Sequence, residues 1–177
     1  GLRLTSEVEG TDPARSTPLS ATGITMSGSA IANLGTNSVI TVTGKTAGEG
    51  AYGLSIYDNS KVIADHLTLT VTSPLEARAI GVSILSTAAS AKTGSTIDFG
   101  LGSIVTAKGY AIKGLSAGGT NSKIIGDSLQ VSAEGERSTG VQVDDYWTID
   151  LGVGSQVAVK GNLATGINVY STNNALF

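Results

Sequence analysis

The chain has 177 residues and a net charge of −3, with no cysteine, 5% aromatic residues and 40% hydrophobic residues. Disordered chains are poor in apolar residues and strongly charged, so this apolar content predicts a folded domain. The lack of cysteine excludes disulfides and thiolate metal sites, and the lack of a basic stripe argues against nucleic-acid binding.

The first 20 residues show no repeat. Pro13 and Pro18 stand there among Gly, Ser, Thr and Asp, all of which favour turns. An exposed sheet edge or solenoid end needs a cover. We therefore expect residues 1–20 to form a loop or a cap at the N-terminal end of the domain.

From residue 21 onward, a unit of 26–30 residues recurs. In its first segment a small residue precedes alternating apolar residues, and this small residue is Gly23, Gly53, Gly81, Ala111, Gly140 and Gly166. A second apolar segment lies around Ile31, Ile63, Ile97, Ile124 and Ile149. A third, rich in β-branched residues, covers 39–43, 67–71, 104–107, 129–132 and 157–159. Alternation with a period of two between turn-forming residues predicts short strands.

A three-stranded unit of this size can bury its apolar side only against neighbouring units. We therefore predict an all-β fold: a right-handed parallel β-helix, or solenoid, with three strands per rung. It would have about six rungs over residues 21–177 and stop within a seventh. Its inward stack would consist of Ile24, Leu54, Val82, Ile112, Val141 and Ile167. An antiparallel β-sandwich is the alternative, but it gives no reason for every third strand to resemble the first.

Two departures from the repeat supply the candidate binding residues. The first is the cluster Asp144, Asp145, Tyr146 and Trp147, at a turn where the other repeats have small or polar residues. Aromatic residues are enriched in recognition surfaces; alternatively, Trp147 folds back over the rod. The second is the segment 86–94, which contains Ser86 and Lys92 and is either a recognition loop or a spacer.

Residues suited to catalysis are sparse. His66 is the single histidine and is expected at the surface or at a corner. A glycosidase needs two carboxylates that flank one bond, but Ser86 interrupts the register column that Asp58 and Asp145 share. The other aspartates fall near turns, where carboxylates accept hydrogen bonds from backbone N–H groups. We therefore expect no catalytic residue, no metal and no cofactor.

The repeat has a recognisable style. Residues 97–112 (IDFGLGSIVTAKGYAI) and 149–155 (IDLGVGS) follow a pattern in which Asn or Gly and then Ser precede alternating apolar residues. This pattern resembles that of the passenger domains of bacterial autotransporters, most closely the pertactin-like β-helix adhesins. The resemblance extends over residues 20–177.

The resemblance implies a protein at the bacterial cell surface or in the extracellular space. It also implies export by a signal peptide and a C-terminal outer-membrane barrel, neither of which we find in these 177 residues; we therefore expect a fragment of a longer protein. The implied function is that of a non-catalytic adhesin or structural passenger. Its partners would be host-cell or matrix proteins, glycans or other bacteria, with no nucleic acid and membrane contact only through the barrel. The alternatives are a polysaccharide lyase or glycosidase, and a self-associating stalk module.

Overall fold

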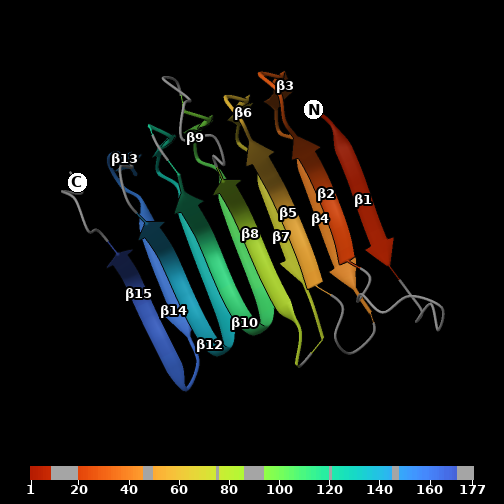
Figure 1. Ribbon diagram of the computed structural model, residues 1–177, viewed down its shortest axis with the longest axis vertical. Helices are drawn as coiled ribbons and strands as arrows, with labels where there is room; N and C mark the ends of the chain where they lie inside the picture. The colour runs from red at the N-terminus through yellow and green to blue at the C-terminus, as the bar shows by residue number, and fades with distance from the viewer. Residues whose placement is uncertain are drawn as a thin grey trace.

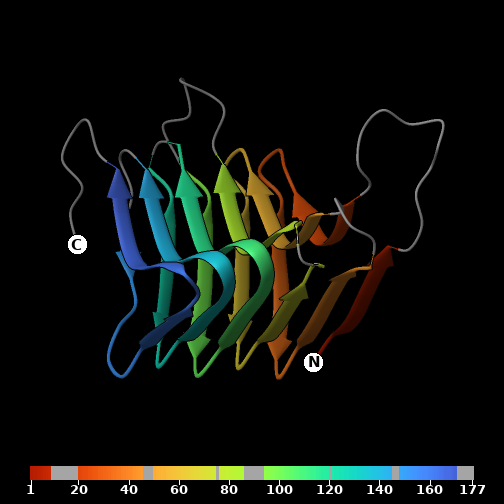
Figure 2. The ribbon, with the colours of Figure 1, turned by 90° about the horizontal axis from the view of Figure 1, so that it is seen from below.

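The computed structural model describes residues 1–8, 20–45, 50–74, 76–85, 94–119, 121–144 and 148–170. In these ranges the chain forms fifteen β-strands and no α-helix, and so no described helix could cross a membrane. The strands run parallel and coil into a solenoid of about five turns (Figures 1 and 2). This arrangement confirms the predicted right-handed parallel β-helix.

Each rung contains a first, a second and a third strand. The first strands are β2 (Ser20–Met26), β5 (Gly50–Tyr57), β8 (Arg78–Leu85), the second half of β10 (Ile104–Gly118), the second half of β12 (Gln130–Asp144) and β15 (Leu163–Tyr170). The second strands are β3 (Ile31–Thr36), β6 (Lys61–Asp65), β9 (Thr96–Leu101), β11 (Lys123–Asp127) and β13 (Thr148–Asp150). The third strands are β1 (Arg3–Val8), β4 (Val39–Gly44), β7 (Thr68–Thr72), the first halves of β10 and β12, and β14 (Gln156–Lys160).

Strands β10 and β12 each pass from the third side of one rung to the first side of the next without a break (Figure 2). Gly109 and Gly135 pair with each other at this corner. A Cβ on Gly135 would collide with the carbonyl oxygen of Gly109. Glycine therefore lets the two bent backbones approach each other here, as glycine does where backbones meet closely.

A glycine column runs along the first strands and corrects the predicted register of the fourth rung. Leu115, not Ile112, pairs with Val82 and Val141 in the inward stack. The small residue of that rung is therefore Gly114 rather than Ala111. A Cβ on Gly114 would lie 2.6 Å from the carbonyl oxygen of Gly140, and the same crowding recurs at Gly23, Gly53, Gly81 and Gly140. Ile112 is buried as well, but it pairs with Ala79 and Ser138.

Part of the N-terminal segment belongs to the repeat, contrary to the expectation that residues 1–20 form only a loop or a cap. Strand β1 pairs in parallel with β4, with Leu4 opposite Ile40 and Ser6 opposite Val42. It therefore adds a third-side strand to the N-terminal edge of the sheet (Figure 1). Residues 9–19, the remainder of the predicted loop or cap, lie outside the described residues.

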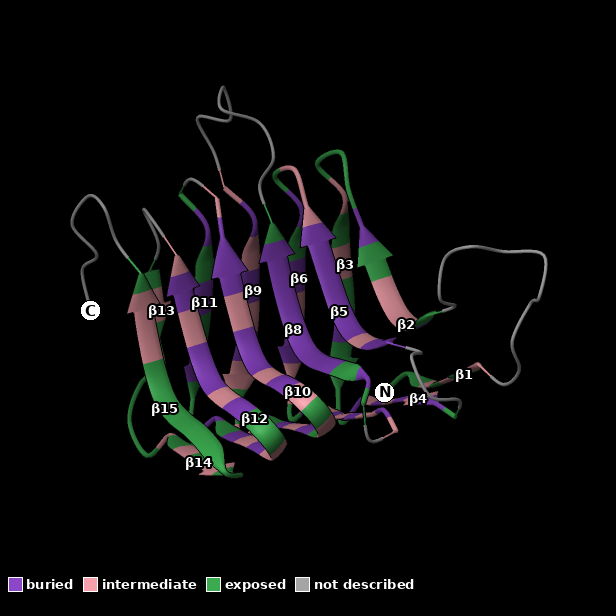
Figure 3. Cartoon of the chain, turned by 60° about the horizontal axis from the view of Figure 1, so that its bottom comes forward, coloured by how far each residue is buried: buried purple, intermediate pink, exposed green. Residues whose placement is uncertain are grey.

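The interior is a continuous apolar cluster, and Figure 3 shows that buried residues run along the neighbouring strands β5, β8, β10 and β12. Leu54, Val82 and Leu115 are fully buried in one column, and Leu69 and Val105 in another. Phe99 is the largest fully buried side chain in the described ranges. It fits because the equivalent position on one neighbouring rung is Gly126, whose added Cβ would lie 3.1 Å from the Phe99 Cβ. The narrow interior thus accommodates the aromatic ring of Phe99 because the adjacent residue is glycine, which has no side chain.

The corner between the second and third strands alternates between two forms from rung to rung. The residue just before the third strand is, in order, Leu2, Ser38, Leu67, Ser103, Leu129 and Ser155. Lys61 and Thr96 pair in register, yet Leu67 follows Lys61 by six residues and Ser103 follows Thr96 by seven. A serine rung therefore holds one extra residue at this corner.

An Asx-apolar-Gly tripeptide accommodates the extra residue. These tripeptides are Asn33-Leu34-Gly35, Asp98-Phe99-Gly100 and Asp150-Leu151-Gly152. In each of them the side-chain oxygen accepts a hydrogen bond from the glycine N–H, as in Asp98 Oδ1 with Gly100 N at 3.1 Å. Gly100 has a φ of +54°, which costs glycine little and other residues more.

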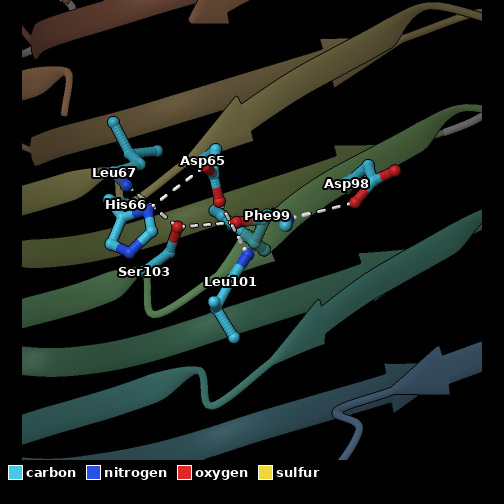
Figure 4. A network of polar contacts seen from close by, with 8 residues as sticks. Asp65, His66, Leu67, Asp98, Phe99, Leu101 and Ser103 are labelled. Carbon is cyan, nitrogen blue, oxygen red and sulfur yellow. Dashed lines mark hydrogen bonds and ion pairs between the residues drawn. The ribbon is translucent and has the colours of Figure 1, made fainter. Parts of the chain in front are cut away.

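The serine hydroxyl joins a serine rung to the adjacent leucine rung. Ser103 Oγ accepts the Leu67 N–H at 2.9 Å and donates to the Phe99 carbonyl at 2.7 Å (Figure 4). Ser38 bridges Leu2 and Leu34 in the same way, and Ser155 bridges Leu129 and Leu151. Because Ser103 is fully buried, no solvent replaces these partners easily.

Replacing Ser103 with alanine should lower the free energy of unfolding by about 1–3 kcal/mol, because the buried Leu67 N–H and Phe99 carbonyl lose their partner. Ser60→Ala is the matched control: Ser60 is equally buried, but its hydroxyl has no hydrogen-bond partner among the described residues. We expect that variant to be neutral or slightly stabilised. Chemical denaturation followed by circular dichroism measures both, and equal losses would contradict the bridging role of Ser103.

Candidate functional site on the first-strand face

The outer surface of the first strands, called here the first-strand face, carries two rows of side chains in register. One row is Thr22, Tyr52, Ile80, Lys113, Thr139 and Thr165; the other is Thr25, Ser55, Ser83, Ser116, Gln142 and Asn168. Along each strand the two rows are separated by two residues, a glycine and a member of the inward stack, as Gly114 and Leu115 separate Lys113 from Ser116. Most are uncharged and polar. Lys113 is the exception in charge.

A cavity of about 240 Å³ lies on this face, over the beginning of the first strands. Arg78, Lys113 and Arg137 all line it. Arg78 and Arg137 come from the rungs on either side of Ala111, with which both pair in register. Because neighbouring strands are about 4.8 Å apart, the two arginine backbones flank the cavity at a separation of about 10 Å.

Lys113 lies at the centre of this cationic group and is half-buried. Burial lowers the pKa of its ammonium group, the positive charge of Arg78 lowers it further, and the carboxylate of Asp144 opposes both effects. Within the described part of the chain, none of the three cations forms an ion pair. By contrast, Lys108 and Lys160 both bind the carboxylate of Glu134, at 3.1 and 2.8 Å.

Asp144 is the one predicted binding residue that the structure describes. It ends β12, and its carboxylate accepts hydrogen bonds from Gln142 Nε2 at 3.2 and 3.4 Å. The carboxylate lies over Gly118, beside the side chain of Leu85, which ends β8. Asp144 and Leu85, the last described residue before segment 86–94, therefore lie at the same end of the first-strand face. Ser86, Lys92, Asp145, Tyr146 and Trp147 lie outside the described residues.

The acidic residues at the corner between the second and third strands have structural partners. Asp65 Oδ1 accepts the Leu101 N–H of the next rung at 2.9 Å, and Asp127 Oδ1 accepts the Val153 N–H at 3.2 Å. Figure 4 shows Asp65 directed toward both Leu101 and His66. These contacts fit the expectation that aspartates near turns accept hydrogen bonds from backbone N–H groups. Among the described residues, no three His, Cys, Asp or Glu side chains are grouped so that they could hold a metal.

His66 occupies this same corner, as expected. Its Nδ1 lies 3.2 Å from Asp65 Oδ2, and its side chain is 45% exposed. Its φ of +51° marks it as the turn residue of a leucine rung, the place that Ser128, with a φ of +52°, takes two rungs later. Its role here is that of a corner residue with one carboxylate partner.

The stability of the fold should fall in acid partly through Asp65. The N–H of Leu101 holds the pKa of this carboxyl below its ordinary value, against a smaller opposing effect of desolvation and with help from His66. A carboxyl with a lowered folded-state pKa stabilises the fold above its unfolded pKa of about 3.9, and this contribution disappears as the pH falls through the folded value.

The measurement is the unfolding midpoint between about pH 7 and about pH 3, for the wild type and for Asp65→Asn. The amide keeps an acceptor oxygen but does not titrate, so the variant should lose less stability on acidification. Glu134, whose pKa is lowered by Lys160 and Lys108, leaves a residual pH dependence in both proteins. Identical slopes for the two proteins would exclude the proposed contribution of Asp65.

Comparisons with known proteins identify no relative of this chain. No family model matches the chain, and neither a curated protein nor a solved structure matches it. The resemblance to autotransporter passengers therefore remains an interpretation of the repeat style. What the first-strand face does has to be argued from its own residues.

Proposed function

We propose that this chain is a non-catalytic binding segment of a surface-exposed, autotransporter-like adhesin, and that it binds host-cell or matrix components through the first-strand face. The observation that carries the proposal is that charged side chains have structural partners at one corner of the solenoid, whereas three cations on the first strands have no ion-pair partner among the described residues. At the corner between the second and third strands, Asp65, Asp98, Asp127 and Asp150 accept hydrogen bonds from backbone N–H groups. By contrast, the three cations at the beginning of the first strands, Arg78, Lys113 and Arg137, line a cavity and have no ion-pair partner among the described residues.

The chemistry of the two surfaces supports binding over catalysis. A glycosidase needs one carboxylic acid and a second carboxylate on either side of the bond. At the corner, Asp65, Asp98, Asp127 and Asp150 each accept a hydrogen bond from a turn N–H. Near the cavity, Asp144 is the acid that acts on Lys113. The face offers hydroxyl, amide and cationic groups, which are suited to holding a partner.

The test is an adhesion assay with the purified chain coupled to beads. Beads with the folded chain should adhere to cultured epithelial cells or to matrix-coated wells, and the soluble chain should compete. The variant Asp144→Asn/Trp147→Ala should weaken adhesion, since it changes two residues of the cluster predicted from the sequence, of which Asp144 ends β12. Lys123→Gln, which changes an exposed charge on the second strands, is the control and should adhere normally.

Two outcomes would contradict the proposal. Folded beads that adhere no better than beads coated with the unfolded chain would remove the adhesive function. Release of new reducing ends or of unsaturated sugars from an acidic polysaccharide would show catalysis, and would favour the alternative of a polysaccharide-active enzyme.

A further inference from the structure

We propose that Arg78, Lys113 and Arg137 form a binding site for a sulfate group carried by a glycan. This inference deepens the proposed binding function, on which it rests, by naming the chemical class of the partner. It uses a cavity that the sequence alone did not indicate.

The charges around the cavity are unbalanced in a chain that is acidic overall. Three cations line a cavity of about 240 Å³, whereas the net charge of the chain is −3. The carboxylate of Asp144 acts on Lys113 electrostatically but forms no ion pair with it within the described residues. A half-buried cation without a partner is unfavourable, and an anion in the cavity would relieve that cost.

The arrangement suits an oxyanion with several acceptor oxygens. Arg78 and Arg137 approach from opposite sides of the small residue Ala111, and Lys113 stands on the rung between them. Arginine presents its N–H groups as a planar fork that can donate two parallel hydrogen bonds to one oxyanion. Lysine adds a compact point charge. One sulfate group can therefore meet all three side chains together.

The surroundings favour a sugar as the carrier of the sulfate. Thr139 and Leu163 also line the cavity, and they offer a hydroxyl and an apolar surface. Ser116 and Gln142 continue the polar row beside it. Hydroxyl and amide side chains pair readily with sugar hydroxyls, and a cavity of this volume suits one sugar unit better than the broad contact area of a folded protein.

The direct test is calorimetric titration of the chain with a fully sulfated heparin-derived tetrasaccharide and with its desulfated counterpart. We expect binding that requires the sulfate groups and weakens as salt is added, because the contacts are ionic. Arg78→Gln, Lys113→Gln and Arg137→Gln should each lower the affinity by about tenfold. Lys123→Gln removes the same charge away from the cavity and should leave the affinity unchanged.

Several outcomes would overturn the inference. Equal binding of the desulfated sugar would exclude a sulfate site. Equal losses for Lys123→Gln and Lys113→Gln would indicate general charge attraction. Tighter binding of a phosphoserine peptide than of the tetrasaccharide would assign the cavity to a protein partner. Thermal unfolding of each variant shows whether it is folded; if Lys113→Gln is unstable, the two exposed arginine variants carry the test.

The two proposals can fail separately. If beads adhere to cells but the tetrasaccharide does not bind, the sulfate site is wrong and the adhesive function stands. If the tetrasaccharide binds through the three cations but beads do not adhere, the site is real and the adhesive function is wrong.

Discussion

Replacing Phe99 with alanine is expected to lower the free energy of unfolding by about 3–5 kcal/mol. Phe99 is fully buried and is the largest fully buried side chain among the described residues. Its neighbour on the next rung is Gly126, which has no side chain to move into the vacated space. The cavity should therefore stay largely open, and its cost adds to the lost burial of the ring.

Equilibrium unfolding in urea, followed by circular dichroism, measures this loss. Val153→Ala is the control, because Val153 is 85% exposed and should change the free energy of unfolding by no more than about 0.5 kcal/mol. If Phe99→Ala costs under about 1 kcal/mol, the ring is not enclosed as described. A second, earlier transition in Phe99→Ala would show that the middle rungs unfold separately, as units of a solenoid can.

The second large effect is expected for Gly114→Ala, which should destabilise the fold by about 3 kcal/mol through overpacking. The new methyl group would lie 2.6 Å from the carbonyl oxygen of Gly140 and would also crowd the side chain of Val131 on the opposite wall. Neither neighbour can yield easily, since one is backbone of the next rung and the other is a core side chain. The rung would have to shift along the solenoid axis.

Gly166→Ala is the matched control for this change. Gly166 belongs to the same column, but a Cβ there meets nothing within 4 Å among the described residues. In a thermal melt of the 177-residue chain, Gly114→Ala should lower the midpoint by roughly 6–12 °C, while Gly166→Ala should change it little. A similar midpoint for the two variants would contradict the close approach of backbones along the glycine column.

The fold could be predicted from the sequence because it depends on a repeated pattern. Alternating apolar residues with β-branched side chains and regularly spaced glycines identify the strands and their stacking. The register of the first strands was harder to predict than the fold. In the fourth rung, Tyr110-Ala111-Ile112 has the small-then-apolar pattern that begins the first segment of the other rungs. The close backbone contact with Gly81 and Gly140, however, is made by Gly114. Local alternation does not reveal which small residue meets the next rung.

Strand β1 was missed for a related reason. Its residues Arg3 to Val8 alternate as a third strand does, but no first or second segment near them completes a unit. The Leu2 position, matched by Leu67 and Leu129, was the available signal. It becomes visible only when the leucine and serine rungs are compared separately.

The candidate site could be predicted only in part. The cluster at Asp144 stood out because it departs from the repeat, and the structure places Asp144 at the end of the first-strand face. The cationic cavity gave no such signal. Arg78, Lys113 and Arg137 are separated by 35 and 24 residues, so no linear basic motif exists. The coiling of the chain brings residues from three successive rungs together. The overall composition and net charge do not reveal such a local group of cations.

The alternation of leucine and serine at the corner sets the unit by which such a chain can grow or shrink. Leu67 and Leu129 are 62 residues apart, a span of two rungs. Deleting a single rung would place two leucine corners or two serine corners side by side, and the bridge from a leucine N–H to a serine hydroxyl would be lost there. Gene duplication or deletion that preserves the corner must therefore act on pairs of rungs. Designed extensions of this rod should be built from the same two-rung module.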